Sequence, residues 1–436
     1  MLLAVVGFVS IAVMMYLLLK GKALPLTGFT VVPLVAAVCC GFGFTEIMDF
    51  ITTGVSSTWA TAVLFIFSIA YFGLMNDVGL FDKMVEKLVK VAGNNVMAVT
   101  LVTGVVAVIG HLDGSATTTY IITIGALLPL YQKMRLRPLV LLLICGAATG
   151  VMNLVPWGGP TARVAAVTGI DGNLLWHAMI PMQIFGLVAV FVVAAIFGVI
   201  EKKRLAREGN LGDGAALAAQ AEKEVDPEVQ ALKRPKLFWF NLILTLVLLV
   251  VLCTVKIALY IPFLVATVIA LLVNYPDLKI QNSRIAAHGA SAIPLSATLI
   301  AAGIFLGVYV NSGMIEAMAS TLINIVPGAL QPYLHIIVGA LGAPIGMTMG
   351  PDPYYYGIMP LIGEVVAQYG VPLEEVGYAM LIGENAALAC SPCVPANYVA
   401  LGLSGIALKD HAKFSFLWLW GISLAMLAFA MVTGLI

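Results

Sequence analysis

Residues 150–163 read Gly150-Val-Met-Asn-Leu-Val-Pro-Trp-Gly-Gly-Pro-Thr-Ala-Arg163 and follow an apolar run, 139–149. Proline removes a backbone donor and glycine releases the chain from helical dihedral angles, so a helix that enters this stretch has to break. Inside a bilayer, a break is tolerated only where protein or a water-filled cavity satisfies the free backbone groups. Arg163 is always charged, and it either meets an anion in the protein interior or snorkels to the membrane interface. The prolines and glycines before it favour a binding site at a broken helix.

The composition is that of a membrane protein. Of the 436 residues, 61% are hydrophobic and 10% are charged, and the mean hydropathy is +1.04. Soluble domains carry about 25% charged residues, so this chain is predicted to cross a lipid bilayer many times. Residues 1–6 carry no basic side chain, and we expect them to begin a first span and not a cleaved signal. The net charge of zero gives no reason to expect a nucleic-acid partner.

Apolar runs of spanning length occur along the whole chain. Two longer apolar stretches, 95–131 and 333–362, are interrupted halfway by polar residues, and each predicts a re-entrant hairpin with its tip inside the protein. The segments 138–165 and 376–400 contain proline-rich breaks and predict broken helices. The ten predicted crossings lie at 2–19, 24–42, 58–76, 138–155, 175–200, 237–254, 258–275, 291–310, 376–392 and 414–436.

The two halves of the chain repeat. A polar segment, 201–236, is predicted to be a linker between repeats at 1–200 and 237–436. Residues 72–84 match residues 306–318 at an offset of 234 positions, and similar offsets recur further along the chain. A nearly constant offset is the pattern that an internal duplication produces.

The placement of basic residues predicts the orientation in the membrane. All but two of the 22 Lys and Arg residues fall on one face, which the positive-inside rule assigns to the cytoplasm, and the exceptions are Arg163 and Lys256. Each half crosses five times, so the second repeat is inverted relative to the first. We therefore predict an all-α polytopic membrane protein of two inverted repeats, each with five transmembrane helices, a re-entrant hairpin and a broken helix. Both termini are expected outside and the linker in the cytoplasm.

Two motifs carry a family resemblance. Asn153-Leu-Val-Pro-Trp-Gly-Gly-Pro-Thr-Ala-Arg163 and Leu112-Asp-Gly-Ser-Ala-Thr-Thr-Thr-Tyr120 resemble the citrate-metal-proton symporter family of the ion transporter superfamily. The resemblance covers essentially the whole chain, although the family pattern has a second Asp where this chain has Ser115. It implies a homodimer in the prokaryotic cytoplasmic membrane with an elevator-like movement. It also implies a scaffold made from the first and last helices of each half, and a mobile part that carries the hairpins and broken helices.

The two hairpin tips and two broken helices are predicted to meet near the membrane midplane. A half-helix that begins after a break offers unpaired N–H groups to an anion, and Arg163 can bind a carboxylate with two donors. A single Ser or Thr at such a start is equally well explained as an ordinary helix cap. The predicted substrate-binding residues are Arg163, Thr161, Gly158, Gly159, Asn153, Ser115, Thr117, Thr118, Asn385, Ser391 and Thr348.

Three acids, Asp113, Asp352 and Glu384, are predicted to bind a metal ion or carry a proton. Buried carboxylates with too few positive partners can titrate, and their oxygens are suitable ligands for Mg²⁺ or Ca²⁺. A hydrogen-bonded pair with Asn385 is the alternative for Glu384. One arginine among three acids compensates poorly for bare citrate, whereas a chelated divalent ion lowers the charge of the substrate. We thus expect import of a metal complex with protons and no permanently bound cofactor.

The sequence is also compatible with other transport functions. A transporter of the same fold for a metal-free tricarboxylate, a dicarboxylate or gluconate is the nearest alternative. A cation/proton antiporter would leave Arg163 without a role. An intramembrane enzyme is not expected, because the chain contains neither His-Glu-x-x-His nor Gly-x-Ser-x-Gly. The lone histidines His111 and His288 are interpreted as structural residues.

Overall fold

A computed structural model of the chain describes residues 1–208, 227–255 and 257–436, and all regular elements in these ranges are helices. Six of these helices are long and apolar enough to cross a membrane, or seven if one bent pair counts as a single span. Shorter apolar helices accompany them. The predicted all-helical membrane fold is confirmed.

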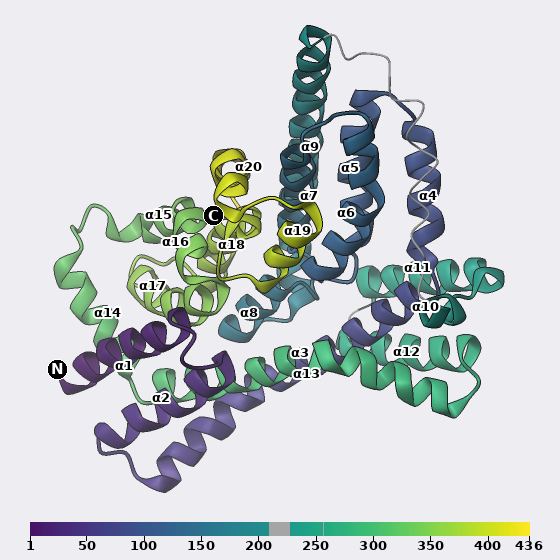
Figure 1. Cartoon of the computed structure of the whole chain (residues 1–436). Coiled ribbons are helices and arrows are strands. Elements are labelled where there is room, and N and C mark those ends of the chain that lie inside the picture. The colour runs from purple at the N-terminus through teal and green to yellow at the C-terminus, as the bar shows by residue number, and fades with distance from the viewer. Residues whose placement is uncertain (209–226, 256) are drawn as a thin grey trace.

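The helices follow the same order in both halves of the chain (Figure 1). The first half contains α1 (Leu2–Leu19), α2 (Pro25–Cys39), α3 (Phe44–Asp77), α4 (Leu80–Ala92), α5 (Val96–Gly110), α6 (Ala116–Lys133), α7 (Pro138–Met152), α8 (Gly159–Thr168) and α9 (Gly172–Arg207). After α10 (Pro227–Leu232) and η1 (Pro235–Leu237), the second half contains α11 (Phe238–Thr254), α12 (Tyr260–Asn274), α13 (Leu278–Asn311), α14 (Met314–Ile325), η2 (Gln331–Tyr333), α15 (Leu334–Ala340), α16 (Gly342–Met349), η3 (Pro353–Ile358), α17 (Met359–Ala367), α18 (Leu373–Glu384), η4 (Asn385–Cys390), α19 (Pro395–Ser404) and α20 (Leu408–Thr433).

The helix bounds repeat with the offset that the sequence shows. Helices α3 and α13 both have 34 residues, and their first residues, Phe44 and Leu278, are matched at the offset of residues 72–84 with 306–318. Helices α8 and α19 both have 10 residues. Gly79 and Gly313 precede α4 and α14 with φ angles of 76° and 75°, a left-handed conformation that glycine adopts without strain. The predicted duplication is therefore confirmed in the helices themselves.

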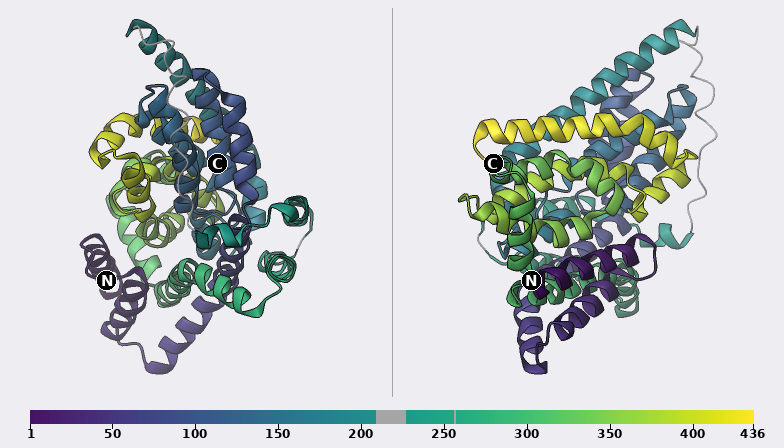
Figure 2. Two further views of the ribbon diagram at one scale, coloured as in Figure 1. Left: turned by 45° about the vertical axis from the view of Figure 1, so that its right-hand side comes forward. Right: turned by 90° about the vertical axis from the view of Figure 1, so that its left-hand side faces the viewer.

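Helices α3 and α13 form the centre of what we call the crossing scaffold, which comprises α1–α3 and α11–α13. They pack along each other, α2 packs on α13, and α12 packs on α3 (Figures 1 and 2). The contact between α3 and α13 is close, because a Cβ atom on Gly54 would overlap the carbonyl oxygen of Gly303. Separate apolar cores lie beneath α1 and α2 and beneath α11 and α12.

The elements α5–α9 and α15–α20 form a second part that we call the hairpin bundle. A third apolar core joins the two hairpins, the broken helices and the last helix of each half. Helix α9 packs on α5, and α20 packs on η4 and α18. The family resemblance implied that the last helices belong to the scaffold, and the structure corrects this. The buried side chains of α9 and α20, such as Phe197 and Leu419, belong mainly to the core of the bundle.

Several helices differ in length or shape from the predicted spans. Helices α3 and α13 begin well before the apolar runs at 58–76 and 291–310. In α3 the polar residues of this extension bond to their own helix, as Thr52 does to the Met48 carbonyl oxygen at 2.8 Å, so they do not end it. The second hairpin bends by 64° between α15 and α16 and continues through the π-helix η3. The sequence predicted the hairpin but neither the bend nor the π-helix.

Candidate functional site

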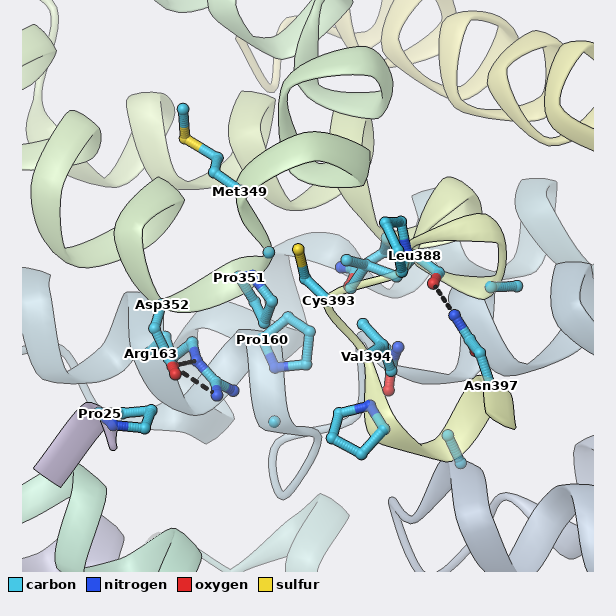
Figure 3. A pocket seen from close by; sticks show the side chains of 18 of the residues that line it. Pro25, Pro160, Arg163, Met349, Pro351, Asp352, Leu388, Cys393, Val394 and Asn397 are labelled. Carbon is cyan, nitrogen blue, oxygen red and sulfur yellow. Dashed lines mark hydrogen bonds and ion pairs between the residues drawn. The ribbon is translucent and has the colours of Figure 1, made fainter. Parts of the chain in front are cut away.

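A cavity of about 600 Å³ lies where the breaks of both halves meet (Figure 3). Helices α6, α8 and α19 begin at its wall with Ala116, Gly159 and Pro395. A further helical segment begins there at Pro351 and continues through η3. The first N–H groups of a helix have no partner within it, and the helix dipole is positive at this end. Four helix starts around one cavity therefore favour an anionic ligand.

The charged groups of the cavity are Arg163 and Asp352, and they bind each other (Figure 3). The Nε and an Nη atom of Arg163 each lie 2.7 Å from one oxygen of Asp352. The two side chains are only 11% and 16% exposed. Arg163 comes from α8 in the first half and Asp352 from the hairpin of the second half, so the pair connects the two repeats. Without a ligand, the pair makes the wall of the cavity nearly neutral.

The cavity includes some of the predicted binding residues and several that the sequence did not indicate. Asn153, Gly159, Arg163, Asp352 and Asn385 line it. The lining residues that were not predicted include Tyr120, Thr149, Cys393, Val394, Asn397 and a group of prolines. Thr149 ends the apolar run 139–149, so only the meeting of the breaks identifies it, whereas Tyr120 ends the polar motif at 112–120.

Three other predicted residues lie outside the cavity wall, and their hydroxyl groups bond to the backbone. Thr161 donates to the carbonyl oxygen of Asn153 at 3.0 Å, and Ser391 donates to that of Met347 at 3.0 Å. Thr348 donates to the carbonyl oxygen of Ile345 at 2.7 Å. None of these three lines the cavity. The hydroxyl groups of Thr161 and Ser391 are occupied by backbone oxygens at the breaks, whereas Thr348 is exposed and bonds to its own helix, α16.

At the tip of the first hairpin, side chains accept hydrogen bonds from backbone N–H groups. Ser115 caps α6 by accepting from the Thr118 N–H at 3.4 Å, and Asp113 accepts from the Ser115 N–H at 2.7 Å. Thr117 is half-buried in the first turn of α6. Neither these residues nor Gly158 lies among those that line the cavity, whereas Gly114 and Ala116 of the same tip do.

Glu384 lies in the core beside the second break. It is fully buried, and neither carboxylate oxygen has a hydrogen-bond partner among the described residues. Gly346 leaves the space for it, because a Cβ atom there would overlap the Glu384 side chain. The alternative pair with Asn385 does not form, since the Asn385 amide donates to the Leu381 carbonyl oxygen at 2.8 Å. The hairpin bundle thus contains a fully buried acid whose carboxylate makes no hydrogen bond among the described residues.

The scaffold covers one side of the cavity with small and apolar residues. Leu18, Gly21, Ala23 and Pro25, from the end of α1 to the start of α2, face the bundle here. Figure 3 shows Pro25 beside the Arg163–Asp352 pair. All the charged and amide side chains of the cavity wall come from the bundle.

The described residues contain no group of three or more His, Cys, Asp or Glu side chains that could hold a metal ion. Asp352 and the amide groups are oxygen ligands of the kind that Mg²⁺ and Ca²⁺ accept, but they are too few to complete a coordination shell of six or more oxygens. An ion in this cavity would need further oxygens from a bound anion. The wall therefore suits a metal that arrives with its ligand.

Comparison with known proteins agrees with this geometry. Residues 6–383 match the citrate transporter family (CitMHS). The chain is 38% identical to the "Citrate transporter" of Bacillus subtilis (strain 168) over 100% of both proteins. It is 37% identical to the "Mg(2+)/citrate complex secondary transporter" of the same organism, over 100% of this chain and 99% of that protein.

A solved structure shows the same fold. The YdaH transporter of Alcanivorax borkumensis superimposes with a TM-score of 0.60 at 13% identity, covering 90% of this chain and 89% of that one. The shared fold and the sequence matches agree with the broken helices and the charged cavity described above. The chain belongs to the citrate transporter family, and it is a membrane transporter and not an enzyme.

Proposed function

We propose that this protein is a secondary transporter that imports citrate as a complex with a divalent cation, Mg²⁺ or Ca²⁺, together with protons. The observation that carries the proposal is the Arg163–Asp352 ion pair in the cavity wall. A relative that is 37% identical over the whole chain is named for a Mg²⁺/citrate complex, which supports the same substrate class here.

The ion pair offers a positive group, Arg163, for an anion and a negative group, Asp352, for a cation. A metal-citrate complex presents a cation and free carboxylate oxygens side by side. When it binds, the metal takes the Asp352 carboxylate and a citrate carboxylate takes the Arg163 guanidinium, so neither buried charge loses its partner. Bare citrate would satisfy Arg163 but would leave Asp352 unpaired beside a polyanion. The pair therefore favours the complex over the free anion.

Glu384 is the carboxyl group that we propose to carry the coupling proton. An ionised carboxylate without a partner is costly in the protein interior, so the neutral acid is favoured when no cation lies near. Glu384 lies beside the second break, where a change in the cavity changes its surroundings. Asp113 and Asp352 are the acids of the hairpin tips, and Glu384 differs from both in having no hydrogen-bond partner among the described residues.

The division into scaffold and bundle supports an elevator-like movement, which we propose to occur in a homodimer. The apolar helices of the scaffold provide lipid-exposed or dimer-forming surface, with residues such as Val35 and Ile269 exposed. We also propose that both termini lie outside and that the linker is cytoplasmic, in agreement with the positive-inside rule.

The orientation predicts opposite labelling of two cysteines. In a background without native cysteines, Lys203→Cys at the end of α9 should react with a membrane-impermeant maleimide only from the cytoplasmic side. Glu374→Cys in the first turn of α18 should react only from outside, because the second repeat is inverted. Labelling is measured in intact cells and in inside-out vesicles. Reaction of both cysteines from the same side would contradict the proposed topology.

The metal-complex proposal predicts that chelation stops uptake. Proteoliposomes that take up labelled citrate in the presence of Mg²⁺ should lose uptake when EDTA removes the divalent ions at constant total citrate. The rate should follow the calculated concentration of the complex, because the bare anion leaves Asp352 unpaired. A control with EDTA and excess Mg²⁺ should restore uptake. Equal uptake without free divalent ions would replace this proposal by transport of a metal-free tricarboxylate.

A further inference from the structure

The buried His111 connects the hairpin tip of the first half to the break in the same half. It is fully buried, at the C-terminal end of α5. Its Nδ1 atom lies 2.7 Å from the Thr119 hydroxyl, and its Nε2 atom lies 3.0 Å from the atom placed as Oδ1 of Asn153. We propose that His111 is a positioning residue that turns the amide oxygen of Asn153 into the cavity, where it binds the divalent cation of the substrate complex. This inference rests on the proposed function.

The hydrogen bonds of Thr119 place a proton on Nδ1 of His111. The Thr119 hydroxyl oxygen lies 2.7 Å from the Ser115 carbonyl oxygen, which cannot donate, so the hydroxyl proton lies between these two oxygens. A hydroxyl has a single proton. The 2.7 Å contact from Thr119 to His111 therefore needs a proton from the histidine, and the ring carries it on Nδ1.

The other ring nitrogen of His111, Nε2, carries no proton. His111 forms no ion pair in the described part of the chain, and a buried imidazolium without an anion is costly. The ring is therefore neutral, and Nε2 holds a lone pair that can only accept. The group of Asn153 that contacts Nε2 must then be the NH₂ group.

The proton positions on His111 determine the orientation of the Asn153 amide. The oxygen and nitrogen of an amide side chain have nearly the same shape, and the hydrogen-bond network decides between them. The structure has Oδ1 at this position, and exchanging it with the NH₂ group, as the proton on Nδ1 requires, turns the amide oxygen to the opposite side. Asn153 lines the cavity and forms no other side-chain hydrogen bond among the described residues. Its oxygen is thus free for a ligand.

The ligand that fits this oxygen is a cation. A neutral amide oxygen is a common ligand of Ca²⁺ and Mg²⁺. The same cavity wall contains the Asp352 carboxylate, so the protein supplies two oxygens and the anion supplies the others. If the NH₂ group faced the cavity instead, it would repel the cation and favour a bare carboxylate. The orientation of one amide therefore contributes to the choice between metal-citrate and citrate.

The proton positions are tested directly by NMR of the full chain in nanodiscs with ¹⁵N-labelled histidine. The chain has five histidines, and the His111 signals are assigned by their loss in His111→Gln. We expect a protonated Nδ1 and an unprotonated Nε2. A proton on Nε2, in either the other tautomer or the imidazolium, would overturn the inference. This measurement needs no substrate, so it stands even if the protein does not transport citrate.

The effect on the ligand is tested with Thr119→Val, since Thr119 does not itself line the cavity. Valine keeps the shape but removes the acceptor for Nδ1–H, so the ring should move its proton to Nε2 and the Asn153 amide should rotate. The affinity for Mg²⁺-citrate, measured by titration calorimetry, should fall by about tenfold or more, as for other changes behind a metal ligand. Binding of citrate in EDTA should not fall.

The matched control is Thr123→Val, one turn further along α6. Thr123 is also buried, but its hydroxyl has no hydrogen-bond partner among the described residues. Its loss should leave both the His111 signals and the affinity for Mg²⁺-citrate unchanged. If Thr119→Val moves the proton to Nε2 and leaves this affinity unchanged, the cation-binding role of Asn153 is wrong. A protein that binds citrate only in EDTA would contradict the proposed function, while the NMR result would still decide the orientation of the amide.

Discussion

Arg163→Lys is expected to remove most citrate uptake while the protein still folds and inserts. The arginine contacts Asp352 through two nitrogens, each 2.7 Å from the carboxylate oxygen, and its planar group can take a citrate carboxylate with the same two donors. Lysine has one compact charge that cannot make both contacts. Loss of a partner in a largely buried charge pair costs about 2 kcal/mol or more, which corresponds to roughly a thirtyfold loss of affinity. Uptake by proteoliposomes and the melting temperature of the purified protein are measured together.

A second conservative change serves as the control. Arg284→Lys removes a guanidinium in α13 that lies 3.8 Å from Asp77 and outside the cavity. It should leave uptake near the level of the unchanged protein. Normal uptake by a well-expressed Arg163→Lys protein would mean that Arg163 binds no substrate and only holds Asp352.

Glu384→Gln is expected to end accumulation driven by a proton gradient but to keep exchange of internal for external citrate. Glutamine has nearly the same shape and fits beneath Gly346, so the fold and the cavity should be preserved. It has no proton to release, and the carboxyl group that it replaces is fully buried with no hydrogen-bond partner in the described part of the chain. In proteoliposomes with an acidic outside, the unchanged protein should concentrate citrate. The variant should only equalise the two sides.

The control for this change is Glu364→Gln, which removes an exposed acid of α17. Accumulation should remain proton-dependent there, because an exposed carboxylate exchanges protons with water in every state. If the Glu384→Gln variant still accumulates citrate against its gradient, the coupling proton is carried by Asp113 or Asp352. Counterflow of labelled citrate in the same vesicles shows whether the exchange step is intact.

The local chain breaks were predictable from sequence, because proline and glycine act within one or two turns of a helix. The run before Arg163 and the interruption after His111 are both breaks in the structure. The duplication was equally predictable, since one offset relates α3 to α13. These features depend on short-range conformational preferences and on internal repetition, and both can be read from one chain.

The partners of the polar groups were not predictable. Arg163 and Asp352 are 189 positions apart and come from different repeats, so no pattern in either repeat indicates their contact. Thr161 and Ser391 looked like substrate ligands, but the breaks use their hydroxyl groups to satisfy free backbone oxygens. His111 was interpreted as a structural residue from the sequence. The groups that it contacts, at a helix start and at a break, meet only in the folded protein.

The uneven origin of the cavity wall has a consequence for the speed of transport. Every charged and amide side chain of the wall belongs to the hairpin bundle, whereas the scaffold contributes Leu18, Ala23, Pro25 and one glycine. Apolar contacts are weak individually, about 0.1–0.2 kcal/mol for each atom pair, and they reform continuously as one surface slides over another. A hydrogen bond to the ligand from a stationary residue would have to break at each step, at about 1–3 kcal/mol. Under the proposed movement, the loaded bundle therefore slides past the scaffold with low friction.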